Sequence, residues 1–417
     1  AIFKPNLFCD FFRSKLILQR PISVQNLFCD FFRSKFILRR FLKMRPFLGL
    51  FKKAWSHFIS RFRFKALKKG VREFIKSKGL LMKSIGIIIL NWQGWRDTLA
   101  CLDSLQALNC SRPISLIVCD NGSEDDSWHQ ILNWAQKHYS PSEIAVFSQE
   151  KADCAVQQGK SICHYTPFIL IQTGANLGFA GGNNVGIRYA LATEQYEYLW
   201  LLNNDTTVDV NALSRLYEQA IADPQIALLG STVIDYYQPD IVQCAGGCRY
   251  FPLTTILKPV LGGQAINTVM QHDPAITLDY VYGAAMFLKV EAVQKVGLLN
   301  EAYFLFYEEL DYSQRLKRLG YQIGWCQKSL VYHKGSASVG SVREGNREKL
   351  RRANYYENLN TLKYTANFHR HLLPFVMISR FIGKSLALIK RRDFDLFAPL
   401  LKAYKDFFQQ QYLRKRK

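Results

Sequence analysis

Short apolar runs alternate with segments of helical periodicity through the middle of the chain. Four runs have the length and continuous apolar character of strands that are buried on both faces of a sheet. They are Ile85–Leu90, Ser115–Cys119, Phe168–Gln172 and Tyr198–Leu202. Thr98–Leu108 carries leucine at every third position from residue 99, which predicts a helix with one apolar stripe. The alternation predicts an α/β fold with a mixed, mainly parallel sheet flanked by helices.

Polar residues follow the predicted strands. Asn91 and Asp120 come directly after the first two runs, and Asn176 and Asp205 follow the third and fourth within a few residues. In open α/β sheets, ligands bind outside the carboxyl ends of the strands. These four residues are therefore expected to share one site.

The C-terminal part of the chain is predicted to be helical and basic. Glu308–Leu319 is a predicted helix that opens with carboxylates, and helical periodicity resumes at Tyr355. Farther on, apolar residues between 372 and 381 stand among Arg and Lys, and two interpretations are open: this part lies flat on a bilayer, or it packs on the preceding domain. The most apolar stretch, His371–Ile389, contains Arg380 and Lys384, so no membrane-spanning helix is predicted.

The N-terminal region contains a tandem repeat. Asn6–Lys15 and Asn26–Lys35 both read NLFCDFFRSK. Two copies are too few for a solenoid, and Arg and Lys interrupt the apolar stretches too often for a signal peptide. We expect residues 1–43 to be disordered or foreign to the native protein, with a membrane-binding arm as the alternative. The predicted organisation is an N-terminal extension (1–83), a catalytic-type domain (84–340) and a basic helical region (341–417).

The net charge of +22 is unevenly distributed. Residues 1–83 hold 21 Lys and Arg against 3 Asp and Glu, residues 342–417 hold 18 against 6, and the residues between them hold 16 against 24. Two basic extensions around an acidic domain favour attraction to anionic lipid over nucleic-acid binding. The expected location is the cytoplasm, peripheral at the inner face of the cell membrane.

The ten cysteines lack the paired spacing of a disulfide framework, which favours a reducing compartment. Cys244 and Cys248 come nearest to a metal-binding pair, but no second Cys or His pair follows them.

Five motifs occur in a fixed order. They are IGIIILNWQGW with DNGS at 120–123, GANLGFAGGNNVGI at 174–187, WLLNND at 200–205, YGAAM at 282–286 followed by YFLFYEELD at 303–311, and VYHKGS at 331–336. Together they resemble glycosyltransferase family 2, in particular its bacterial rhamnosyltransferase-like members, over about Ser84–Ser338. The resemblance implies a GT-A fold and transfer of a hexosyl or rhamnosyl group, with inversion, from a nucleoside-diphosphate sugar to a hydroxyl acceptor.

The resemblance also assigns roles to residues. It makes Glu309 the general base, with Glu308 and Asp311 holding the site in shape, and it makes Asp205 a ligand for Mg²⁺ or Mn²⁺. His333 is assigned to the metal or to the diphosphate, because a neutral imidazole ligates and a protonated one donates. The expected nucleotide-sugar-binding residues are Asn91, Asp120, Asn121, Asn176, Gly178, Phe179, Gly182, Asn183, Asn184, Asn204, Asp205, Gly283 and Ala284.

Two positions depart from the family pattern. Asn203 and Asn204 leave Asp205 as the one carboxylate of the metal motif, and Glu309 stands where Asp is usual. Each motif alone also has an ordinary explanation, as a turn after a strand or as acidic residues at a helix N-terminus.

Three other functions are alternatives to this one. A processive polysaccharide synthase needs membrane-spanning helices and a Q-x-x-R-W element, which Gln314-Arg315 does not provide. A sugar nucleotidyltransferase needs a glycine-rich basic loop after its first strand, and Asn91–Gly94 lacks one. The third alternative is a catalytically impaired module that binds nucleotide sugars. The two departures from the family pattern, at Asn203-Asn204 and at Glu309, favour this alternative. The sequence leaves the sugar, the nucleotide and the acceptor unidentified; a glycan or lipid-linked acceptor in polysaccharide or glycolipid assembly is the expectation.

Overall fold

The structure is a computed structural model, and it describes residues 83–151, 165–335 and 347–416. The described residues all belong to one compact unit, Met82–Lys417. The N-terminal repeat lies outside the described residues. So do Ser336 and the segment up to residue 346, where the catalytic domain was expected to end.

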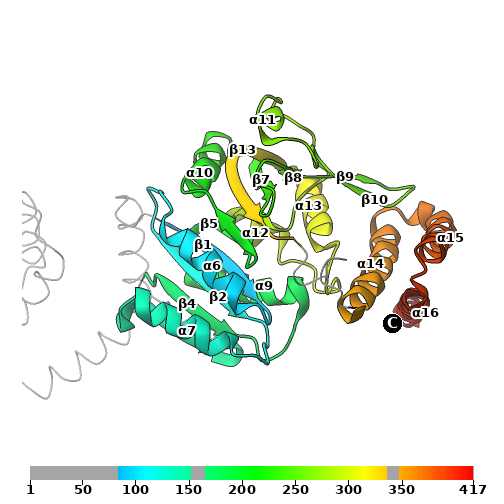
Figure 1. Cartoon of the computed structure of the whole chain (residues 1–417), viewed down its shortest axis with the longest axis horizontal. Coiled ribbons are helices and arrows are strands. Elements are labelled where there is room, and N and C mark those ends of the chain that lie inside the picture. The colour runs from blue at the N-terminus through cyan, green and yellow to red at the C-terminus, as the bar shows by residue number, and fades with distance from the viewer. Residues whose placement is uncertain (1–82, 152–164, 336–346, 417) are drawn as a thin grey trace, which may run out of the picture. The chain divides into compact units, whose positions relative to one another are not determined.

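A ten-stranded sheet runs through this unit (Figure 1). Its main path has the order β3-β4-β2-β1-β5-β12-β7-β13-β6, and β8 pairs with β7. The five strands from β3 to β5 are mutually parallel, whereas β12 is antiparallel to both β5 and β7. The strands are β1 (Ser84–Asn91), β2 (Ile114–Asp120), β3 (Ile144–Ser148), β4 (Phe168–Gln172), β5 (Tyr196–Asn203), β6 (Thr206–Val208), β7 (Ile226–Asp235), β8 (Val242–Ala245), β12 (Ala285–Lys289) and β13 (Gln322–His333).

The central strands are apolar on both faces because helices cover both. Along β1, Ile88 packs in one core cluster with α9, while Ile87 and Ile89 pack in a second cluster with α6 and α7. Alternate side chains of a strand point to opposite faces, so a strand between two helical layers is apolar throughout. The helices are α6 (Trp95–Gln106), α7 (Ser127–His138), α9 (Gly178–Thr193), α10 (Ala212–Ala222), α11 (Ile266–Val269), α12 (Val290–Val296) and α13 (Glu308–Arg318).

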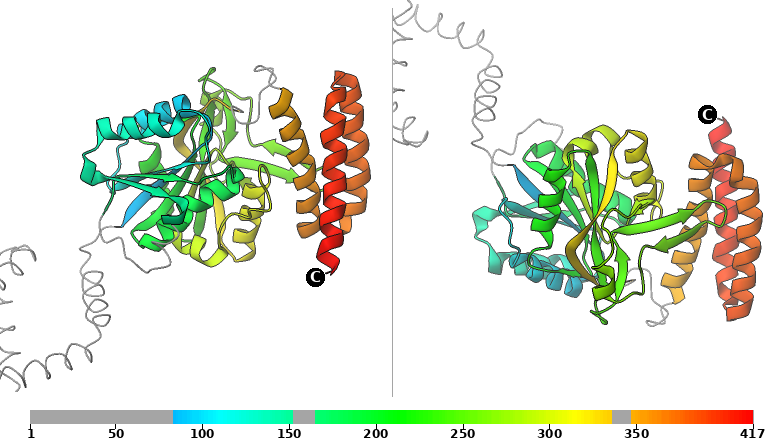
Figure 2. Two further views of the ribbon diagram at one scale, coloured as in Figure 1. Left: turned by 90° about the horizontal axis from the view of Figure 1, so that it is seen from below. Right: turned by 90° about the horizontal axis from the view of Figure 1, so that it is seen from above.

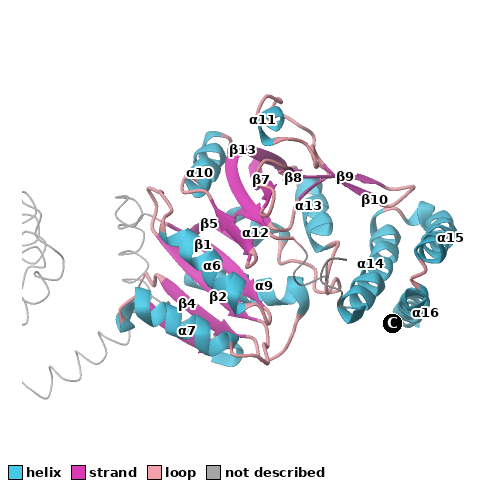
Figure 3. Cartoon of the chain, viewed as in Figure 1, coloured by secondary structure: helices cyan, strands magenta, loops and turns pink. Residues whose placement is uncertain are grey.

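A smaller sheet and three C-terminal helices complete the unit (Figure 3). The small sheet has the order β10-β9-β11, formed by β9 (Gly247–Phe251), β10 (Ile256–Pro259) and β11 (Tyr280–Val281). The long helices α14 (Arg347–Phe368), α15 (Leu373–Arg391) and α16 (Phe397–Arg416) lie side by side (Figure 2). Single 3₁₀ turns lie at Pro141–Glu143, Arg370–Leu372 and Phe394–Leu396.

The predicted fold class is confirmed: the sheet is mixed, mainly parallel and flanked by helices. All four predicted strands are present, each with its bounds within two residues. The predicted helices at residues 98, 308 and 355 correspond to α6, α13 and the middle of α14. Figure 1 shows the strands β4, β2, β1 and β5 side by side, as their parallel pairing requires.

Candidate active site

A buried chain of hydrogen bonds joins the carboxyl ends of β2, β1 and β5. The Asn91 amide donates to Asp120 Oδ1 at 2.8 Å, and the Thr98 hydroxyl donates to Asn91 Oδ1 at 2.7 Å. The Asn204 amide donates to Thr98 Oγ1 at 3.0 Å. Asn91 and Asp120 are also opposed in the β1–β2 register. Of the four residues expected to share one site, Asn91 and Asp120 are in direct contact, and Asn176 is reached through a hydrogen bond from Asn121, the neighbour of Asp120. Asp205 follows Asn204 directly.

The Asp120 carboxylate has one satisfied and one unsatisfied oxygen. Oδ1 also accepts from the Ser123 hydroxyl at 2.6 Å, whereas Oδ2 is buried and has no hydrogen-bond partner in the described parts of the chain. A buried acceptor without a donor is destabilising by about 1–3 kcal/mol. A ribose hydroxyl or a base N–H would supply that donor. Asp120 is itself fully buried and does not line the cleft described below, so its donor-binding role stays a prediction.

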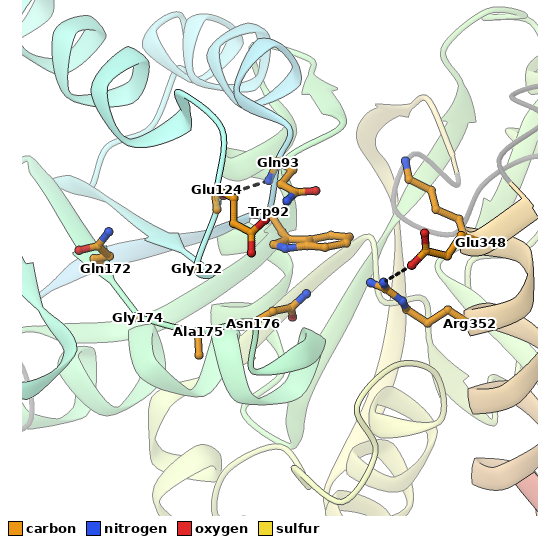
Figure 4. A pocket seen from close by; sticks show the side chains of 12 residues that line it. Trp92, Gln93, Gly122, Glu124, Gln172, Gly174, Ala175, Asn176, Glu348 and Arg352 are labelled. Atoms are coloured by element: carbon orange, nitrogen blue, oxygen red, sulfur yellow. Dashed lines mark hydrogen bonds and ion pairs between the residues drawn. The ribbon is translucent and has the colours of Figure 1, made fainter. Parts of the chain in front are cut away.

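A cleft of about 880 Å³ opens beside these strand ends (Figure 4). Trp92 follows β1 directly, and its ring stands in the cleft opposite Arg352 of α14. The guanidinium carbon of Arg352 lies 5.3 Å from the ring centre of Trp92, within cation–π range. The cleft is lined by Trp92, Gln93, Gly122, Ser123, Glu124, Gln172, Gly174, Ala175, Asn176, Glu348, Lys349 and Arg352. Its volume is typical of small-molecule sites.

The glycine-rich segment is fixed by contacts within the protein. The Asn121 amide donates to Asn176 Oδ1 at 3.1 Å and to the Gly178 carbonyl at 3.2 Å. Gly178 has φ +74°, and a Cβ there would lie 2.3 Å from the Phe304 carbonyl oxygen. At Gly182 a Cβ would lie 2.4 Å from Leu90 Cδ1. Packing therefore already demands both glycines, which the resemblance assigned to nucleotide-sugar binding.

The asparagines of α9 are also engaged internally. Asn184 is fully buried; its amide donates to the Leu299 carbonyl at 2.9 Å and its Oδ1 accepts from the Leu299 N–H at 3.0 Å. Asn183 donates to the Phe179 carbonyl at 2.9 Å, and the Phe179 N–H donates to the Phe304 carbonyl at 2.8 Å. Asn184 and Phe179 thus tie α9 to the segment that precedes α13. Donor binding by these residues stays a prediction.

Asp205 and His333 meet at the ends of β5 and β13. Asp205 Oδ1 lies 3.2 Å from His333 Nε2, and both side chains are buried. On the other side of the ring, His333 Nδ1 lies 3.0 Å from Gln243 Oε1. The Gln243 amide nitrogen donates to Asp235 Oδ2 at 3.2 Å and to the His333 carbonyl at 2.9 Å. Two acceptors around that nitrogen fix the orientation of the Gln243 amide, so Nδ1 must carry a proton.

The tautomer has a consequence for His333 Nε2. With Nδ1 protonated, a neutral imidazole directs the Nε2 lone pair at the Asp205 carboxylate, and Nε2 has no partner of hydrogen-bond geometry among the described residues. Two lone-pair atoms at this distance require a proton or a metal cation between them. Metal-bound histidines characteristically donate their other N–H to an oxygen, as His333 does to Gln243. Asp205 and His333 therefore fit as two ligands of a divalent cation. In the described ranges no group of three or more His, Cys, Asp or Glu forms a complete metal site, so the cation would need further ligands from water or the substrate.

The segment before α13 is conformationally strained. Phe306 and Tyr307 have φ +68° and +74°, a conformation that costs a non-glycine residue about 1–3 kcal/mol. Asn360 of α14 holds this turn, because its amide donates to the Leu305 carbonyl at 2.8 Å and to the Phe306 carbonyl at 3.2 Å. The turn aims the first residues of α13, Glu308 and Glu309, at the sheet.

Glu309 lies beside the small residues that precede β12. A Cβ built on Gly283 would lie 3.7 Å from Glu309 Oε1. The neighbouring Ala284 carbonyl accepts from the Asn203 N–H at 3.0 Å, directly before the metal motif. Tyr282 packs edge-on against His333, with the ring centres 6.1 Å apart. The segment 282–284 thus brings the predicted base and the predicted metal ligands to the same place.

The two glutamates at the start of α13 are buried and influence each other. Burial raises the pKa of Glu309, and hydrogen bonds from the backbone and from Glu308 oppose that rise. Burial raises the pKa of Glu308 well above its ordinary value, and the adjacent Glu309 charge raises it further. The pair therefore titrates as one unit, with a pKa above the ordinary glutamate range.

Asp311 is engaged with Arg315. The Arg315 Nε donates to Asp311 Oδ1 at 2.6 Å, and its terminal nitrogens donate to the carbonyls of Val296 and Leu298 at 3.0 and 2.9 Å. Asp311 thereby anchors the loop after α12 to α13. This contact agrees with the shape-holding role predicted for it.

Sequence reasoning missed Trp92, Gln243, Arg352 and Asn360. Trp92 directly follows the first strand and carried a detectable signal. The other three come from segments that the motif set does not include, and Arg352 and Asn360 lie beyond its C-terminal end. Their proximity to the cleft or to the active-site turns depends on tertiary structure.

Comparisons with known proteins found a matching family model and a curated relative. The family model described as glycosyl transferase family 2 matches residues 135–244. The low-salt glycan biosynthesis hexosyltransferase Agl10 of Haloferax volcanii is 26% identical over 222 residues, which cover 51% of this chain and 64% of that protein. The match thus spans less than two thirds of the relative's length.

Solved structures with a similar trace include two glycosyltransferases. The mannosyltransferase PcManGT from Pyrobaculum calidifontis, in complex with GDP-Man and Mn²⁺, is 12% identical, with a TM-score of 0.44 and coverage of 78% of this chain and 87% of that one. GalNAc-T7 with UDP, GalNAc and Mn²⁺ is 12% identical, with a TM-score of 0.46 and coverage of 73% and 54%. Residues 135–244 thus match glycosyltransferase family 2, the same family that the ordered motifs resemble.

Proposed function

We propose that this protein transfers a sugar from a nucleoside-diphosphate sugar to an acceptor hydroxyl, with inversion at the anomeric carbon. The observation that carries the proposal is the position of Glu309, which lies beside Gly283. The segment 282–284, to which Gly283 belongs, also contacts Asn203 and His333. A carboxyl group whose pKa is raised by burial suits a general base.

The donor is proposed to occupy the cleft beside Trp92. Asp120 Oδ2 accepts from the base or the ribose, and the indole of Trp92 and the guanidinium of Arg352 frame the entrance. Lys349 and Arg352 place two cations beside the cleft, which suits a diphosphate. The nucleoside diphosphates and divalent cations named in the relatives' complexes support the same class of ligand.

Asp205 and His333 are proposed to hold Mg²⁺ or Mn²⁺. The cation supplies stabilisation of the charge that develops on the departing diphosphate. Glu309 removes the proton from the acceptor hydroxyl as its oxygen attacks the anomeric carbon from the face opposite the diphosphate. The acceptor is proposed to bind on the side of Glu309 where Gly283 lies.

The acceptor is proposed to be a glycan or a lipid-linked hydroxyl, in cell-surface polysaccharide or glycolipid assembly. The curated relative is a hexosyltransferase named for glycan biosynthesis, which supports this acceptor class and a hexosyl or rhamnosyl donor.

Two isosteric variants on the same helix turn test the assignment of the base. Glu309→Gln removes the base, and we expect turnover to fall by about 10²–10⁴-fold while donor binding stays within about twofold. Glu308→Gln keeps a hydrogen-bond donor to Glu309 and is expected to retain most of the turnover. Donor hydrolysis and transfer are measured together with donor affinity. Equal turnover in wild type and Glu309→Gln would remove the assignment, and the absence of hydrolysis and transfer in wild type would favour an inactive binding module.

A further inference from the structure

Helix α15 has one face that packs in the protein and one that is bare. Val376 and Leu388 are buried against α14 and α16, whereas Phe375, Ile378, Ile382, Leu386 and Ile389 are each 52–65% exposed. We call these five residues the α15 stripe. Their spacing of three or four residues confines them to an arc of about 80° on a helix of 3.6 residues per turn. The two interpretations left open for this region are thus compatible: the helix packs on its neighbours and presents an apolar stripe.

The charged residues of α15 lie away from the stripe. Arg380 and Lys384 point to the packed side, where both donate to the carboxylate of Glu357 on α14 at 2.8–3.0 Å. Burial alone would raise the pKa of Glu357, but Arg380 and Lys384 hold that pKa below its usual value. The two cations that interrupt the apolar sequence are therefore paired with Glu357 within the protein, and the outward face between Leu373 and Ile389 carries no charge.

Both ends of the stripe are basic. Arg370 and His371 are exposed before it, and Lys390, Arg391 and Arg392 are exposed after it. Residues 358–392 contain no Asp or Glu. An apolar stripe with cations at its ends matches the layering of an anionic membrane surface, in which acyl chains lie below phosphate headgroups.

The arrangement favours a helix that lies in the membrane surface. By length and composition, Arg370–Arg391 is apolar enough to cross a bilayer, with mean hydropathy 1.7 and 11% of its best window buried. However, the ion pairs to Glu357 and the contact of Arg380 with Thr255 at 2.8 Å hold its other face against polar parts of the protein. Spanning would draw those polar groups into hydrocarbon.

We propose that the α15 stripe docks on an anionic lipid bilayer, with the stripe in the acyl boundary and the flanking cations among the phosphates. This inference concerns a surface separate from the donor cleft and does not depend on the transferase assignment.

Vesicle flotation of the full-length protein tests the proposal. The probes are phosphatidylcholine vesicles with and without 30% phosphatidylglycerol, mixed with the wild type, with Ile378→Asp/Leu386→Asp, and with the matched control Ile221→Asp. Ile221 is an equally exposed apolar residue on α10. Circular dichroism and thermal melting establish that the variants are folded, and Ile378→Ser/Leu386→Ser serves as a milder pair should the Asp pair melt early.

We expect the wild type and Ile221→Asp to bind anionic vesicles alike, and the stripe variants to bind at least tenfold more weakly. Lys390→Gln/Arg391→Gln/Arg392→Gln should reduce binding to anionic vesicles and reduce its dependence on salt. Binding of the stripe variants at wild-type strength would overturn the proposal and assign any membrane affinity to other parts of the chain. Equal binding to neutral and anionic vesicles, or none to either, would also overturn it.

Discussion

Gln243 sets the tautomer of His333. Its removal should therefore weaken cation binding, although Gln243 does not itself contact the proposed cation. Its side chain makes three hydrogen bonds, at 3.0 Å to His333 Nδ1, 2.9 Å to the His333 carbonyl and 3.2 Å to Asp235. Gln243→Met keeps the size of the side chain and deletes all three. Loss of a partner that orients a metal-bound histidine typically weakens metal affinity about 10–100-fold. At about 1.4 kcal/mol per factor of ten, this corresponds to roughly 1.4–2.8 kcal/mol.

A second glutamine separates this effect from a general loss of stability. Gln327 is also half-buried and donates to the carbonyls of Val269 and His272 at 3.1 and 3.0 Å, with no contact to His333 among its hydrogen bonds. Each lost hydrogen bond destabilises by about 1 kcal/mol, so Gln243→Met and Gln327→Met should both lower the melting temperature by several degrees, on the order of 2–4 °C per kcal/mol.

The assay is a Mn²⁺ titration followed by electron paramagnetic resonance, with inorganic pyrophosphate present as a stand-in for the donor diphosphate. Gln243→Met is predicted to bind Mn²⁺ at least tenfold more weakly than the wild type, and Gln327→Met within twofold of it. Equal Mn²⁺ affinity in wild type and Gln243→Met would refute the reasoning from the tautomer.

Four other predictions concern the two glutamates at the start of α13, the strained turn and the cleft. The folded environment raises the pKa of Glu309, so kcat/KM should be lost as the pH falls through that raised pKa. Measurements of kcat/KM against pH should therefore place the acid limb above the ordinary glutamate range. Glu308 stabilises the fold while protonated, so stability should decline as the pH rises through its raised pKa, and Glu308→Gln should flatten that decline in denaturation experiments. Asn360→Leu frees the carbonyls of the strained turn and should lower kcat about tenfold or more while leaving donor affinity nearly unchanged, as measured by steady-state kinetics and titration. Arg352→Gln should weaken nucleoside-diphosphate binding several-fold, whereas Arg351→Gln, which removes an ion pair to a residue outside the cleft, should not; calorimetry distinguishes them.

The fold follows from the sequence because its strands are locally encoded. The run from Ile85 to Leu90 is buried on both faces, and such a strand reads as a continuous apolar segment whatever its neighbours. The polar residue after each run could be assigned to the site for the same reason, since parallel strands share one edge. The other six strands of the large sheet, β3, β6, β7, β8, β12 and β13, were not predicted. Strand β3, for example, has the pattern IAVFS, which is short and only partly buried.

The remaining site residues depend on tertiary contacts. Gln243 reaches His333 across 90 residues, and Asn360 reaches the turn at Leu305 across 55. A lone glutamine or asparagine has no sequence pattern that indicates such a partner. The positive φ of Phe306 and Tyr307 could not be predicted from the sequence either, because aromatic residues do not indicate a left-handed turn. The glycines of the 174–187 motif were found from the sequence, but their packing against Phe304 and Leu90 was not.

Thermal denaturation with a panel of nucleoside-diphosphate sugars and Mn²⁺ tests the central claim most directly, that the strand ends form one donor site. The account predicts that a nucleoside-diphosphate sugar raises the melting temperature of the wild type, and that Asp120→Asn and Asp205→Asn each diminish that rise, since a ligand stabilises only the state that binds it. A panel without any stabilising nucleotide sugar, or a full response in both variants, would contradict it.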